Sequence, residues 1–312
     1  MLTFRHILAP LDFSGLASQA LTCAVPLARN YRAKISLVHV VQSPVAIAAM
    51  PGAMGYVPVN TENLVGAAKT RLDALALQLL PEDVRGQVIV REGNPAREVV
   101  VSAKTLKADL IVLSNTGRSG LKRVVLGNTA ERIVRHAHCP VLTVRRQSAG
   151  PALRLGSLER PLYPERLPWR RILVPLDFSL TSLQALRVAV PLGKQSGARL
   201  LLLYVVEPNP YPMSVEGAVL VMPDATVARN AKKQLPQVTR RLIPKSVRVT
   251  ALVARGRAAD TIVKTAEQNG VDLIVLSTHG HTGWERLLIG STAEGVVRQA
   301  KCPVFVVRKP RE

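Results

Sequence analysis

The feature that most constrains the fold of this chain is an internal duplication. The segment Asp109–Ser114 recurs as Asp272–Ser277, 163 residues later, and Leu-Asp-Phe-Ser occurs at 11–14 and again at 176–179. A repeat of this length is a whole domain, because the units of a solenoid are much shorter. With 312 residues, the chain is also long enough for two domains that each bury a core.

Each half alternates apolar, strand-like runs with segments of helical apolar spacing. In the first half we predict strands at 6–11, 34–41, 87–92, 109–113 and 140–144, and helices at 16–31, 62–80, 94–105 and 129–137. Alternation of this kind predicts a parallel sheet with right-handed crossovers. We therefore expect an α/β protein with two tandem open parallel five-stranded sheets and helices on both faces. The predicted first domain covers 1–147, a linker covers 148–168, and the second domain covers 169–312.

Two long connections interrupt this regular order. Residues 42–60 are rich in Pro, Ala, Met and Gly, residues 207–226 are rich in Pro, Val and Met, and neither segment has a clear period. We expect loops there. They could act as a lid or a partner surface, or simply as packed crossover segments.

The chain is strongly basic, with 42 Lys and Arg against 21 Asp and Glu and a formal net charge of +21. Such a charge attracts polyanions, so nucleic acid is a candidate partner. The basic residues are spread along the chain, and an aromatic content of 4% weakens the case for stacking on single-stranded bases. A solvated basic surface explains the charge equally well.

Cysteine usage and hydropathy indicate the compartment. The three cysteines form no C-x-x-C pair, which fits a reducing environment. The first residues lack the pattern of a leader peptide, and the longest apolar runs have the length of strands. We expect a soluble, cytoplasmic protein that makes no membrane contact.

His136 and His138 lie two residues apart, a poor spacing for a metal pair, so we predict no metal site.

In each half the fourth strand leads to a glycine, nine further residues, a second glycine and a helix start. In the second half these residues are Gly280, Gly290, Ser291 and Thr292. The corresponding first-half residues are Gly117, Gly127, Asn128 and Thr129. Amides at a helix N-terminus that follow a glycine bind anions, although the same residues can serve only as turns and caps. The unit is not a Walker P-loop, because no Gly-Lys-[Ser/Thr] is present.

The repeated Ile-Leu-x-Pro-Leu-Asp-Phe-Ser, the glycine unit and the Cys-Pro-Val before each last strand resemble the universal stress protein family. The resemblance implies a Rossmann-like, adenine nucleotide alpha hydrolase-like fold that binds ATP, with or without Mg²⁺. In the second half it implies contacts from Asp177, Val205, Gly280, Gly290, Ser291 and Thr292. In the first half the matching positions are Asp12, Val40, Gly117, Gly127, Asn128 and Thr129.

Two departures from the family pattern distinguish the halves. Ser114 and Ser277 replace the first motif glycine, and Asn128 replaces the Ser or Thr that follows the last one. We therefore predict a degenerate site in the first half and a better preserved one in the second. The resemblance also implies antiparallel pairing of the last strands, Val141–Val144 and Val304–Val307, either across a homodimer or within the chain as a pseudo-dimer.

The function that this sequence favours is an ATP-binding stress-response protein that acts as a regulator or sensor. We do not expect an efficient enzyme, and at most weak ATP hydrolysis, because the sequence contains no recognisable catalytic constellation. Two alternatives stay open: a protein-interaction module of the same fold that binds no nucleotide, and a basic polyanion-binding protein.

Overall fold

The computed structural model describes most of both halves. The described residues are 3–14, 17–42, 45–50, 53–58, 61–114, 127–145, 163–208, 213–215, 218–220, 224–278 and 289–308. Within these ranges, no helix has the length and apolar content needed to cross a membrane.

The first half alternates strands and helices in the predicted order. Its elements are β1 (His6–Pro10), η1 (Ala17–Ala20), α1 (Leu21–Tyr31), β2 (Lys34–Val41), β3 (Val45–Met50), β4 (Ala53–Pro58), α2 (Glu62–Leu79), η2 (Glu82–Val84), β5 (Arg85–Glu92), α3 (Pro95–Thr105), β6 (Leu110–Ser114), α4 (Asn128–His136) and β7 (Val141–Val144). Most predicted boundaries are correct to within two residues. The first predicted helix instead begins as a 3₁₀ turn and becomes α-helical only at Leu21.

The second half repeats this order. Its elements are β8 (Arg171–Pro175), α5 (Leu180–Ser196), β9 (Arg199–Val206), β10 (Met213–Val215), β11 (Ala218–Leu220), α6 (Asp224–Leu242), β12 (Val249–Arg255), α7 (Ala258–Gln268), β13 (Leu273–Ser277), α8 (Ser291–Gln299) and β14 (Val304–Val307). Pro191 and Pro236 lie inside α5 and α6, and both helices continue beyond them.

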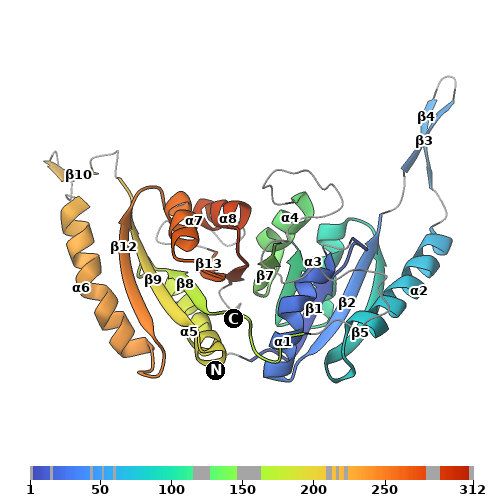
Figure 1. Cartoon of the computed structure of the whole chain (residues 1–312). Coiled ribbons are helices and arrows are strands. Elements are labelled where there is room, and N and C mark those ends of the chain that lie inside the picture. The colour runs from blue at the N-terminus through green and yellow to red at the C-terminus, as the bar shows by residue number, and fades with distance from the viewer. Residues whose placement is uncertain are drawn as a thin grey trace.

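The prediction of loops at 42–60 and 207–226 was wrong in part, because each connection contains a β-hairpin. In the first half, β3 and β4 pair antiparallel from Val45 opposite Pro58 to Met50 opposite Ala53. β10 and β11 pair in the same way in the second half. Local antiparallel pairing satisfies the backbone groups of a connection that has no helical period. Figure 1 shows the β3–β4 hairpin projecting away from the rest of the first half.

All the main strands belong to one ten-stranded sheet, in the order β12-β9-β8-β13-β14-β7-β6-β1-β2-β5. Within each half the five strands are parallel and the order is third, second, first, fourth, fifth. The halves join where β14 pairs antiparallel with β7, with Phe305 opposite Leu142. The two predicted sheets are therefore continuous, and the last strands pair within the chain.

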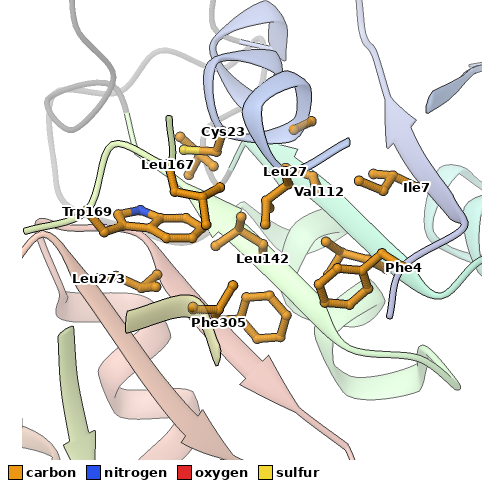
Figure 2. Packing of buried hydrophobic residues seen from close by; sticks show 14 of the residues in the cluster. Phe4, Ile7, Cys23, Leu27, Val112, Leu142, Leu167, Trp169, Leu273 and Phe305 are labelled. Atoms are coloured by element: carbon orange, nitrogen blue, oxygen red, sulfur yellow. The ribbon is translucent and has the colours of Figure 1, made fainter. Parts of the chain in front are cut away.

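A hydrophobic core covers each face of this sheet and extends through both halves. Helices α1, α2, α5 and α6 contribute to one core, and α3, α4, α7 and α8 contribute to the other. At the junction, Figure 2 shows Leu142 among Phe4, Trp169 and Phe305, all of which are buried. Phe4 and Phe305 lie 6.2 Å apart between ring centroids. Since these residues come from both halves, apolar packing holds the halves together.

Ion pairs between α4 and α8 repeat the symmetry of the junction. Arg135 lies 3.0 Å from Glu131 on its own helix and 3.3 Å from Glu294 on the other. Arg298 lies 2.9 Å from Glu294 and 3.5 Å from Glu131. Each arginine thus bridges both carboxylates, so the four charges compensate one another.

Candidate functional site

A cavity of about 810 Å³ opens at the carboxyl ends of the first-half strands. The strand order reverses between β1 and β6, and such a reversal is where ligands bind in open parallel sheets. Five of the six residues predicted for this half line the cavity: Asp12, Val40, Gly127, Asn128 and Thr129. The sixth, Gly117, lies outside the described residues.

Asp12 lies two residues after the end of β1 and orders the turn that follows. Its Oδ1 accepts hydrogen bonds from the backbone N–H of Ser14, at 2.9 Å, and from the Ser14 hydroxyl. Asp177 does the same in the second half, where Oδ1 accepts from the Ser179 N–H at 3.0 Å. The acid thus closes a turn in both halves and does not itself cap the next helix, because the N-cap residues of α1 and α5 are Ala20 and Ser179. The hydrogen bonds from Ser14 also hold the half-buried Asp12 carboxylate in one orientation at the cavity.

Aromatic side chains lie beside this acid, and the sequence patterns did not single them out. Phe13 stacks on His39 with ring centroids 4.0 Å apart, and the Arg71 guanidinium lies 4.5 Å from the Phe13 centroid. All three residues line the cavity. The His39 Nδ1–H donates to the Leu11 carbonyl at 2.7 Å, which fixes the orientation of the ring.

The second half has an equivalent aromatic pair. Phe178 stacks on Tyr204 with centroids 5.1 Å apart. Burial, and then the nearby Asp177 carboxylate, raise the pKa of Tyr204, so its hydroxyl stays a hydrogen-bond donor at neutral pH. Two repeats in the sequence could have indicated these pairs. A Phe follows the strand-end acid in each half, and a ring-bearing residue occurs at both 39 and 204.

The N-terminus of α4 forms another wall of the cavity. Gly127 is the N-cap residue and, as a glycine, brings no side chain that could cap the helix. The amides of the first turn and the positive end of the helix dipole can therefore serve an anion. Ser114, at the end of β6, also lines the cavity, so the substitution of this motif position is compatible with an open site.

The predicted second-half residues occupy equivalent positions. Asp177 follows β8, Val205 lies near the end of β9, and Gly290 is the N-cap residue of α8. Ser291 and Thr292 form the first turn of that helix. Gly280 lies outside the described residues, so the ranking of the second half above the first stays a prediction.

The described residues offer no group of three or more His, Cys, Asp or Glu side chains that could hold a metal ion. One oxygen of Asp12 is already engaged by Ser14. A divalent cation at this cavity would therefore depend on ligands brought by a bound phosphate group.

Comparison with known proteins places both halves in one family. The Universal stress protein family matches residues 3–145 and 168–308. A universal stress protein of Methanocaldococcus jannaschii is 34% identical over 145 residues, which cover 46% of this chain and 85% of the relative. A universal stress protein of Mycobacterium tuberculosis is 24% identical over 314 residues, which cover 97% of this chain and 96% of the relative.

A solved structure shows the same fold over the whole length. A universal stress protein of Archaeoglobus fulgidus superposes with a TM-score of 0.62 at 17% identity, and the superposition covers 99% of this chain and 98% of the other. The family match covers both halves, and the fold is shared from end to end. This chain therefore belongs to the universal stress protein family.

Proposed function

We propose that this protein binds an adenine nucleotide, ATP in the first instance, and acts as a regulator or sensor. The observation that supports the proposal best is the first-half cavity. It brings a strand-end acid, a stacked aromatic pair and a helix N-terminus with glycine as its N-cap residue to one place. These groups suit a ribose, a base and a phosphate respectively.

Each residue of the cavity suits a different part of the nucleotide. The Asp12 carboxylate can accept hydrogen bonds from ribose hydroxyls, and Val40 supplies apolar contact for the base. Phe13 and His39 offer a ring surface beside them. The amides that follow Gly127, together with the Asn128 and Thr129 side chains, face the phosphates. Mg²⁺ would arrive with the phosphates of ATP and complete its shell with water.

The second half is proposed as another nucleotide site. Ser291 and Thr292 provide two hydroxyls in the first turn of α8, where the first half has an amide and one hydroxyl. A hydroxyl is compact and donates directly to a phosphate oxygen. We therefore expect the second half to bind ATP more tightly than the first.

Titration calorimetry with ATP and AMP tests both sites. The variants Gly127→Val and Gly290→Val place a branched side chain at each N-cap, where φ is −65° and a valine fits the backbone. We expect two sites per chain in the wild type, loss of the weaker one in Gly127→Val and loss of the tighter one in Gly290→Val. Absence of wild-type binding at millimolar ATP would overturn the proposal and favour an interaction module.

A further inference from the structure

A second cavity, of about 710 Å³, lies between α3 and α4 of the first half. Its lining includes Arg97 and Val100 from α3 and Asn128, Arg132 and His136 from α4. It shares Asn128 with the cavity described above, so the two meet at the start of α4. We call this cavity the α3–α4 groove.

The spacing of the polar residues places them on one wall. Asn128, Arg132 and His136 are four residues apart along α4, so they lie on the same helical face. All three are exposed. Arg97 stands opposite them on α3, with its side chain 80% exposed.

The arginines of the groove differ in whether they already form ion pairs with carboxylates. Arg135 is bridged to Glu131 and Glu294. Arg132 has no ion pair within the described part of the chain. The nearest carboxylate oxygen to Arg97 belongs to Glu98, at 4.0 Å, and a pair this long and this exposed contributes little. Two cationic side chains therefore remain available for a ligand.

The second half shows that this charge is not a requirement of the fold. Asp260, Gly295 and Gln299 stand at the positions of Arg97, Arg132 and His136. Gln299 donates to Asp260 at 3.3 Å and links α8 to α7. A Cβ on Gly295 would lie 2.7 Å from the Ala259 Cβ, so the two helices approach closely there. The same site in the second half thus has an acid in place of Arg97 and a close helix contact in place of Arg132, whereas Glu131, which also lines the α3–α4 groove, is paired with Arg135 and Arg298.

We infer that the α3–α4 groove binds a phosphate group of an organic phosphate. The planar guanidinium of arginine matches the oxygens of phosphate and donates two hydrogen bonds at once. Arg97 and Arg132 can donate such hydrogen bonds from facing helices, and the Asn128 side chain adds an amide donor. Val100 and Val101 give apolar contact for the organic part of the ligand. The phosphate can come from the terminal phosphates of a nucleotide in the neighbouring cavity or from a separate phosphorylated small molecule.

Calorimetric titration with inorganic pyrophosphate, at physiological ionic strength and without nucleotide, tests the groove directly. We expect binding to the wild type and an affinity lower by about tenfold or more in Arg132→Gln, because charge-assisted hydrogen bonds are lost. The double variant Arg97→Asp/Arg132→Gly introduces the second-half residues and should abolish binding. Circular dichroism confirms that each variant is folded.

Arg229→Gln on α6 is the matched control, because Arg229 is also exposed but lies outside the groove. It should leave the affinity for pyrophosphate unchanged. The inference would be overturned if the wild type failed to bind pyrophosphate. It would also be overturned if Arg229→Gln and Arg132→Gln lost affinity equally, because binding would then reflect only the net positive charge of the protein.

Competition identifies the source of the phosphate. If pyrophosphate competes with ATP but not with AMP, the groove receives the terminal phosphates of the nucleotide. If pyrophosphate binds equally well to the ATP-saturated protein, the ligand is a separate phosphorylated molecule. This inference rests on Arg132, which lines the groove but not the cavity around Asp12, so the loss of pyrophosphate affinity in Arg132→Gln reports on the groove whether or not ATP binds.

Discussion

Phe13 and Phe178 have φ angles of 61° and 63°, a backbone region that bulky residues rarely adopt. The strain occurs at the same position in both halves, directly after the strand-end acid. Asp12 and Asp177 stabilise it by accepting the N–H two residues on. The conformation directs each ring toward its stacking partner, which is consistent with backbone strain concentrating at functional sites.

The three cysteines show how burial controls chemistry at single residues. Cys23, Cys139 and Cys302 are free thiols, and desolvation by burial raises the pKa of each to about 12. A thiol that keeps its proton at neutral pH is a poor nucleophile. These cysteines are therefore structural groups in the folded protein.

Thiol labelling and pH titration test this conclusion. We expect no reaction with an aromatic disulfide reagent at mildly alkaline pH in the folded chain, and reaction of all three thiols after unfolding in urea. The unfolded thiols lose their protons near the ordinary thiol pKa of 9.0, while the folded ones keep them up to a pKa of about 12. The free energy of unfolding should therefore fall as pH rises between these values. Rapid labelling of the folded protein would contradict the prediction.

At the scale of elements, the edge of the first-half sheet depends on one glycine in β5. The register between β2 and β5 shifts between Ile35 and Leu37, and the Ser36 hydroxyl oxygen there accepts the Gln87 N–H at 2.9 Å. A Cβ on Gly86 would lie 2.8 Å from this oxygen and 2.9 Å from the Ile35 carbonyl oxygen. The close approach leaves no space for a side chain.

Gly86→Ala should therefore reduce the free energy of unfolding by about 1–3 kcal/mol through overpacking. Gly66→Ala in α2 is the matched control, because a Cβ there meets no atom within 4 Å. That variant should stabilise the protein by up to about 1 kcal/mol through helix propensity. Urea unfolding measures both changes, and equal effects from the two variants would contradict this view of β5.

At the scale of the molecule, the junction makes one folded body from two repeated halves. β7 and β14 are the fifth strands of their sheets, and each is paired on both sides. Phe305 on β14 is completely buried against residues of the first half, including Phe4. A homodimer through these last strands would require the internal pairing to open first.

We expect the whole chain to unfold in one calorimetric transition, because both cores are continuous through the halves. Phe305→Ala should lower the free energy of unfolding by about 3–5 kcal/mol, since it removes a fully buried ring. Leu180→Ala, at a side chain 82% exposed, should change it by less than about 0.5 kcal/mol. Two separate wild-type transitions would show that the halves fold independently.

Much of the fold followed from patterns close together in the chain. The periods of apolar residues predicted β2, α2 and α3 to within about two residues, because burial on one or two faces leaves a local signature. The hairpins within 42–60 and 207–226 were missed, since their sequences have no clear alternation. The aromatic pairs were also missed, because Phe13 and His39 meet only when β1 and β2 lie side by side.

The sequence by itself determined that the chain has two α/β halves with repeated glycine units and strand-end acids, because these features depend on local order and on the repeat. Only the tertiary structure decided how they combine. Pairing of β7 with β14, the cavity around Asp12 and the groove beside Arg132 each join residues that are far apart in the chain. Such contacts depend on how helices and strands pack in space, and packing leaves no periodic signal in a single sequence.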